Sequence, residues 1–146
     1  MLEAAHLQPV VSPAPDAAPF WAATARHELL LPACTACDSA FFYPRVLCPR
    51  CGSRDLEWIT ASGTGTLYSF CVHYQSSERG LSDAVPFATA LVDLDEGPRL
   101  MGFLVGVPDD PELIAVGGRL EVEYHDLADG HTLLAFRPLS SEPSSR

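Results

Sequence analysis

Apolar and polar side chains alternate in short runs over the second half of the chain. In residues 119–125, Leu120, Val122 and Tyr124 alternate with two glutamates and a histidine, which is the two-residue period of a half-buried strand. Glycine, proline and aspartate separate this run from four others. Turn signals between short strands favour a small closed or nearly closed barrel, with predicted strands at residues 65–73, 86–94, 100–105, 119–125 and 132–137.

The first third of the chain has a different pattern. Residues 1–15 hold three prolines among small and polar side chains, so we expect a flexible tail there, and another over 140–146. Asp16 is a suitable helix N-cap, and no helix breaker follows Pro19 in the aromatic run behind it. The sequence therefore predicts a helical segment at 16–31, a cysteine-containing segment at 32–59 and the barrel at 60–139.

Two Cys-x2-Cys pairs lie ten residues apart in the segment 32–59. Zinc takes four tetrahedral ligands, and thiolates suit it well. Asp38 and Gly52 directly follow the two pairs, and both residue types tolerate the left-handed backbone conformation that such a turn favours. The spacing predicts a structural zinc ribbon whose ligands are Cys34, Cys37, Cys48 and Cys51.

Other chemistries for these four cysteines stay open at this point. Two disulfides would need an oxidising compartment, whereas the first residues lack the basic and apolar segments of a secretory signal. A single iron ion held by four thiolates, as in rubredoxins, is the second alternative. A site closed by four thiolates has no free coordination position, so we expect the metal to be structural rather than catalytic.

The fifth cysteine, Cys71, lies in a predicted strand, and we interpret it as a small buried residue. As a nucleophile it would need a base. His73 is on the same strand face, but the Cα separation of about 6.6 Å is long for a direct contact. The sequence has no Ser-His-Asp spacing and no zinc-protease motif. We therefore predict that the chain has no catalytic residues of its own.

Composition narrows the possible functions. The chain has 146 residues, a net charge of −10 and nine basic residues, all of them arginine, so lysine Schiff-base chemistry is excluded. No apolar run approaches the ~20 residues that span a bilayer, and we expect a cytoplasmic protein. A zinc ribbon joined to a barrel also occurs in nucleic-acid-binding modules. Residues 61–146, however, carry five arginines against thirteen acidic residues, which disfavours phosphate-backbone binding.

Several short motifs occur together with the two cysteine pairs. They are Ala18-Pro-Phe-Trp21, Leu31-Pro-Ala-Cys34, Tyr43-Pro-Arg45, Val85-Pro-Phe87 and Phe136-Arg137-Pro138. In this combination, over roughly residues 16–138, the chain resembles the DUF35 family of acyl-CoA-associated proteins. The resemblance implies a mostly β fold with an N-terminal helix, a rubredoxin-like four-cysteine zinc ribbon and a five-stranded OB-fold barrel.

The resemblance also implies a role. Members of the family pair with thiolase-superfamily enzymes, including acetoacetyl-CoA thiolase with hydroxymethylglutaryl-CoA synthase, and with thiolase-like aldolases that cut steroid side chains. Some pair with, or are fused to, MaoC-type enoyl-CoA hydratases. The implied function is that of a non-catalytic accessory subunit that helps form an acyl-CoA channel. The implied assembly is a heterotetramer with two copies of each chain.

Two groups of residues are candidates for that role. A ribbon of about 25 residues has little interior beyond its metal, so we predict a partner interface at the neighbouring aromatic residues Phe20, Trp21, Phe41, Phe42 and Tyr43. The guanidinium fork of arginine suits phosphate. The predicted CoA contacts are Arg79, in the long loop 75–85, and the turn residues Arg45 and Arg99.

Overall fold

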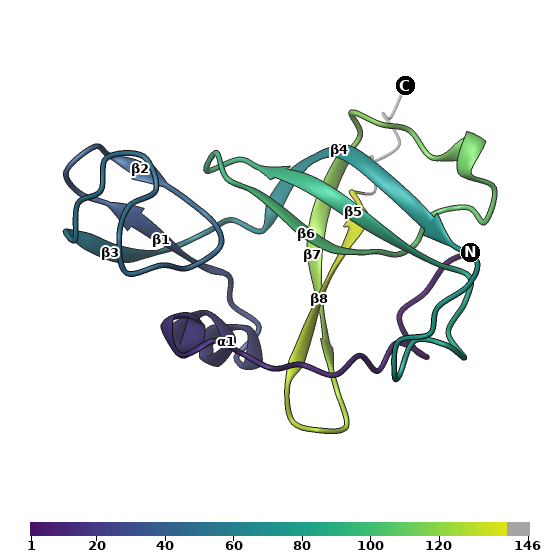
Figure 1. The fold of residues 1–146 in the computed structure, drawn as a ribbon. Coiled ribbons are helices and arrows are strands. Elements are labelled where there is room, and N and C mark those ends of the chain that lie inside the picture. Colours follow the sequence, from purple (N-terminus) through teal and green to yellow (C-terminus); the bar gives the residue numbers. More distant parts are fainter. Residues whose placement is uncertain (140–146) are drawn as a thin grey trace.

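The computed structural model describes residues 1–139, and the flexible tail predicted at 140–146 lies outside the described residues. A ribbon and a barrel lie side by side, with a short helix beneath the ribbon (Figure 1). The 3-10 turn η1 (Pro15–Ala17) leads into α1 (Ala18–Ala25). The strands β1 (Leu30–Cys34), β2 (Ser39–Ala40) and β3 (Leu56–Thr60) then form an antiparallel sheet in the order β2-β1-β3.

The remaining five strands close into a barrel in the order β4-β5-β6-β8-β7. The pair β6 and β8 is parallel, and the short turn η2 (Pro111–Leu113) lies between β6 and β7. All five predicted strands are present, and the predicted fold class is confirmed. Their bounds are β4 (Thr64–His73), β5 (Phe87–Leu94), β6 (Arg99–Leu104), β7 (Arg119–Asp126) and β8 (Thr132–Pro138).

The hydrophobic core of the barrel continues into the ribbon. Leu31 from β1 and Phe20 from α1 belong to the same buried cluster as Leu104 and Phe136 of the barrel. The inner end of the ribbon is therefore held by shared apolar packing. Among residues 1–139, no helix has the length and hydrophobicity needed to cross a membrane.

The first 15 residues differ from the prediction of a flexible tail. Leu2 and Leu7 are 4% and 2% exposed, and the Gln8 backbone N–H donates to the Gly80 carbonyl at 3.0 Å. The segment docks because Leu2 joins the large core cluster that contains Leu104, while Ala4 and Leu7 enter a second buried cluster of the barrel. The segment therefore lies along the barrel as a strap (Figure 1).

The helix is shorter than the predicted 16–31. It ends at Ala25, because His27 adopts a left-handed backbone with φ of 60° and Leu30 already begins β1. Asp16 lies within η1, and the residue that caps α1 is Ala17, without a side-chain hydrogen bond.

Cys71 is exposed, so its interpretation as a buried residue was wrong. A register shift between Leu67 and Ser69 interrupts the pairing of β4 with β5. The extra residue of such a bulge inverts the alternation beyond it. Leu67 faces the core before the bulge, Phe70 and Val72 pack against the core after it, and Cys71 turns outward.

Candidate metal centre and surrounding surface

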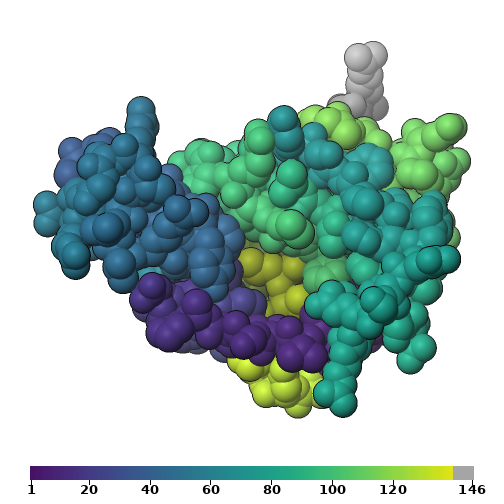
Figure 2. All heavy atoms as spheres, in the orientation of Figure 1, coloured from purple at the N-terminus to yellow at the C-terminus, as the bar shows by residue number. Residues whose placement is uncertain are grey.

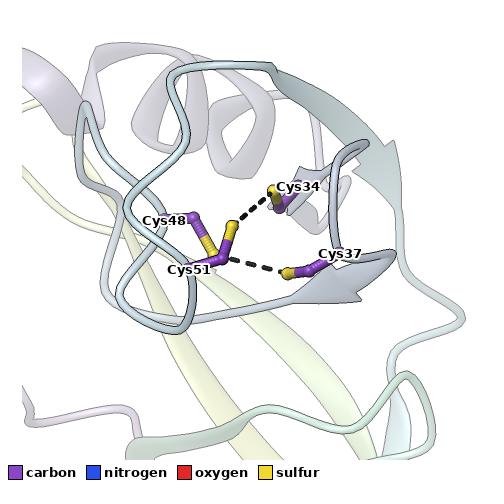
Figure 3. Close-up of side chains that lie close together, drawn as sticks. All are labelled: Cys34, Cys37, Cys48 and Cys51. Atoms are coloured by element: carbon purple, nitrogen blue, oxygen red, sulfur yellow. Dashed lines mark hydrogen bonds between the residues drawn. The ribbon is translucent and has the colours of Figure 1, made fainter.

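The four ribbon cysteines converge on one point (Figure 3). Cys34 ends β1, Cys37 precedes β2, and Cys48 and Cys51 come from the loop between β2 and β3. Their four Sγ atoms all lie within 4.8 Å of one another. The Sγ atoms of Cys34 and Cys51 are 3.6 Å apart, and those of Cys37 and Cys48 are 3.7 Å apart.

These separations fit a tetrahedral metal site. A Zn–S bond of about 2.3 Å corresponds to an edge of about 3.8 Å between thiolates of a regular tetrahedron. The donor set of four sulfurs is also that of a closed structural site. The centre can therefore hold one metal ion and leaves no position for a substrate.

The two turns that carry the cysteines have the expected local conformation. Asp38 and Gly52 have φ values of 56° and 77°. Burial opposes ionisation of Cys48, but the backbone N–H groups of Cys51 and Arg50 donate to its sulfur and lower the pKa of this thiol to about 6. The turn thus favours the thiolate form of Cys48, which binds metal, whereas at Cys51 the hydrogen bond with the Ser53 backbone is outweighed by the neighbouring thiols and burial, which raise the pKa to about 12.

The five predicted interface aromatics fall into two groups. Phe20 and Phe41 are 2% and 8% exposed, so the structure differs from the prediction that they contact a partner. The Phe20 ring packs against the rings of Trp21 and Phe42, with centroids 5.4 and 5.2 Å apart. Trp21 and Phe42 are half-buried and Tyr43 is 37% exposed, and these three side chains line a common pocket against the barrel.

The three predicted CoA arginines also differ in their surroundings. The Arg99 guanidinium pairs with Asp93 at 2.6 Å and lies 3.4 Å from the centre of the Tyr68 ring. Arg45 and Arg79 are exposed and form no ion pair with any of residues 1–139. Of the three, Arg45 and Arg79 therefore have free guanidinium groups, whereas Arg99 is already engaged.

Two carboxylates at the β5–β6 hairpin, Asp93 and Asp95, are paired with arginines. Asp95 accepts hydrogen bonds from Arg119 and from the Thr64 hydroxyl, which lower its pKa to about 2. The Arg99 side chain likewise lowers the pKa of Asp93. Arg99 faces Asp93 across the β5–β6 hairpin, whereas Arg119 is 24 residues from Asp95 in the sequence and meets it only because the barrel closes.

Sequence reasoning missed a pair of exposed apolar residues in the loop between β2 and β3. Val46 and Leu47 lie between the cysteine pairs and are 58% and 39% exposed. They share the loop 41–47 with Tyr43, and this loop, called the ribbon tip below, therefore carries exposed apolar side chains. The sequence did contain a signal for this surface: two consecutive apolar residues in a segment without a predicted strand have no strand face on which to be buried.

Family models match both parts of the chain. The model described as "ChsH2, rubredoxin-like zinc ribbon domain" matches residues 21–57. The model described as "ChsH2, C-terminal OB-fold domain" matches residues 58–125. Together with the clustered sulfurs, the first match confirms the prediction of one metal ion held by four cysteines.

Curated relatives carry two kinds of name. A probable enoyl-CoA hydratase alpha subunit from Thermomonospora curvata is 33% identical over 86% of this chain. The 3-oxo-4,17-pregnadiene-20-carboxyl-CoA hydratase alpha subunit from Mycobacterium tuberculosis is 35% identical over 84% of it. The chain spans only 39% and 38% of those two proteins. A DUF35 domain-containing scaffold protein from Methanothermobacter thermautotrophicus is 30% identical over 71% of this chain and 77% of its own length.

A solved structure matches the fold over nearly the whole length. A chain of the Ltp2-ChsH2(DUF35) aldolase superposes with a TM-score of 0.77 and 32% identity, covering 88% of this chain and 98% of that one. The ribbon, the barrel and their connection are thus shared with a protein named for this family. The chain belongs to the DUF35 family.

Proposed function

We propose that the chain is a non-catalytic accessory subunit that binds a thiolase-superfamily enzyme and contributes to its acyl-CoA site or channel. The observation that carries the proposal is the similarity to the aldolase chain, of which this chain covers 98%. The name of the scaffold relative supports a non-catalytic role. A heterotetramer with two copies of each chain, in the cytoplasm, is part of the same proposal.

The surroundings of the exposed thiol support the absence of catalysis by this chain. The His73 Nε2 atom shares a hydrogen bond of 2.9 Å with the Thr89 hydroxyl. Within residues 1–139, the only hydrogen bond of Cys71 is a 3.9 Å contact with the Val72 carbonyl. A nucleophile needs a base within hydrogen-bond reach, and Cys71 lacks one among these residues.

The barrel surface also argues against a nucleic-acid-binding module. Arg99, Arg119 and Arg137 are each paired with a carboxylate. A strand-binding barrel needs a groove of unpaired cations to displace the counterions of the phosphate backbone. The described part of this barrel offers a single unpaired arginine, Arg79, on its loop.

Co-purification with a thiolase-type enzyme of the same organism tests the proposal. We place the interface at the ribbon tip, so Val46→Glu should weaken the complex at least tenfold, the effect of losing one interface anchor. Val116→Glu is the matched control, because Val116 is 60% exposed on the barrel, like Val46 at 58% on the ribbon. Equal binding by both variants would contradict the proposed interface, and no complex with the unmodified chain would contradict the function.

The free arginines allow a second test in the same complex. Arg79→Ala should leave assembly intact and raise KM for the CoA thioester without lowering kcat, because a phosphate contact far from the reacting carbonyl contributes to binding alone. A change in kcat with constant KM would rule out Arg79 as a CoA contact.

A MaoC-type enoyl-CoA hydratase is the second candidate partner. The two hydratase alpha subunits among the relatives support it. Parallel co-expression with both enzyme types distinguishes the candidates, and retention of the chain by the hydratase alone would favour this second partner.

A further inference from the structure

A cavity of about 610 Å³ lies between the ribbon, α1 and the barrel. Figure 2 shows the hollow, with the ribbon and α1 on one side, the loop after β4 on the other and the yellow atoms of β8 at its floor. Sites for small organic molecules typically measure 300–1,000 Å³. The cavity is therefore large enough for a ligand of more than a few carbon atoms.

The walls are mainly aromatic and aliphatic and come from segments distant in sequence. Trp21 and Phe42 form the side next to the ribbon, while Phe87, Phe103 and Leu134 form the side next to the barrel. The Phe42 ring is held by Phe20 at 5.2 Å, and the Phe87 ring packs on Phe103 at 5.7 Å. Neither the ribbon nor the barrel alone encloses this space.

Few polar side chains line the cavity, and no arginine of residues 1–139 is among its lining residues. His73 is stacked on Phe87 at 4.7 Å and bonded to Thr89. Glu78 also lines the wall. The buried Nε1 atom of Trp21 has no hydrogen-bond partner among residues 1–139, which leaves an unused donor on a residue of the wall.

This charge pattern discriminates between the two ends of an acyl-CoA. The nucleotide end carries several phosphate charges and would require arginine partners. Arg45 and Arg79 lie outside the lining of the cavity, and Glu78 within it would repel an anion. The acyl end is apolar and gains free energy from leaving water, and its carbonyl can accept a hydrogen bond.

We propose that this cavity binds the apolar acyl group of a CoA thioester, while the nucleotide stays outside. The inference rests on the proposed function, since it assigns one end of the substrate to this chain. The accessory subunit then selects the substrate by the size of its acyl group, and the partner supplies the reacting groups.

Binding of an acyl series to the full, metal-loaded chain tests the assignment. Calorimetry with CoA, butanoyl-CoA, octanoyl-CoA and dodecanoyl-CoA should give affinities that rise by up to roughly fourfold per added methylene. The chain has two tryptophans, so in a Trp58→Phe background the fluorescence of Trp21 should change with dodecanoyl-CoA and not with CoA. Equal affinities for CoA and dodecanoyl-CoA would overturn the proposal.

A matched pair of variants locates the site. Ser76 lines the cavity and its neighbour Ser77 does not. Ser76→Phe should lower the affinity for dodecanoyl-CoA at least tenfold and leave that for CoA unchanged, whereas Ser77→Phe should bind as the unmodified chain. Equal effects of the two substitutions would place the acyl group elsewhere.

The same titration in the assembled complex separates this inference from the proposed function. If a partner side chain fills the cavity, the complex assembles but Trp21 no longer responds to dodecanoyl-CoA, which overturns the acyl assignment and leaves the accessory role standing. If the acyl group enters the cavity, Trp21 responds in the complex and the Ser76→Phe effect persists. Failure to assemble contradicts the proposed function instead.

Discussion

The ribbon and the barrel differ in the interactions that stabilise them and in whether their arginines are paired with carboxylates. The barrel is built on buried side chains such as Leu104 and Phe136, and the arginines on its strands are paired with carboxylates. The outer part of the ribbon has four sulfurs at its centre, exposed Val46 and Leu47, and an Arg45 that has no ion pair among residues 1–139. A region whose charges are paired within the chain is suited to hold the fold, whereas a surface with exposed apolar residues and an arginine without an ion pair is suited to contact a partner.

Metal removal should have the largest effect, and it should be confined to the ribbon. Structural zinc contributes roughly 10–16 kcal/mol of folding free energy in zinc-finger peptides. We expect a chelator under reducing conditions to abolish amide-exchange protection around Cys37 and Cys48 while β5 and β6 keep theirs. Hydrogen–deuterium exchange with mass spectrometry measures both regions together.

The cysteine variants provide the control. Cys48→Ser should lose the metal, and Cys71→Ser should retain one ion, because Cys71 is outside the cluster. Fresh reduced protein with less than about half an equivalent of any metal would contradict the ribbon assignment.

Truncating the barrel core should have the next largest effect. Leu104 is 1% exposed, and Leu104→Ala should lower the free energy of unfolding by about 2–5 kcal/mol through lost burial and the cavity left behind. Leu113→Ala is the control, since Leu113 is 67% exposed. Urea denaturation measures the free energy of unfolding of both variants. Unchanged metal content in Leu104→Ala would show that the metal site does not depend on the barrel core.

The strap at the start of the chain should contribute less. Leu7→Ala should cost about 2 kcal/mol, the lower end for a buried leucine, because the segment lies at the edge of the structure. Val10→Ala should be neutral, as Val10 is 63% exposed. Equal stability of both variants in thermal unfolding would mean that the strap is not docked in solution.

The strands and the metal ligands were predictable because their signals are local. Alternation over five to ten residues marks a strand, and two Cys-x2-Cys turns need only each other. The prediction that Cys71 is buried was wrong because a single bulge after Leu67 inverts the alternation of buried and exposed residues. No residue type in this strand indicates the bulge. The cavity was out of reach because Trp21, Phe42 and Leu134 meet only once the barrel has closed.

Lowering the pH should have the smallest effect on stability, through the paired carboxylates of the barrel. The pKa of Asp95 is about 2 in the folded chain and near its model-peptide value of about 3.9 when unfolded. Its contribution to stability is therefore complete above about pH 5 and is lost as the pH falls from about 4 towards 2. Melting temperatures between pH 6 and 2.5 should fall less steeply in Asp95→Asn than in Asp83→Asn, because Asp83 has no ion pair among residues 1–139. Parallel profiles would show that the Arg119 pair adds nothing.

Amide exchange in the complex with a thiolase-type partner tests the accessory role most directly. The account predicts a hetero-oligomer in which residues 41–47 of the ribbon become protected, while the far side of the barrel around Val116 exchanges as in the free chain. Protection confined to the barrel would contradict the proposed interface. Two folded, metal-loaded proteins that elute separately would contradict the accessory role itself.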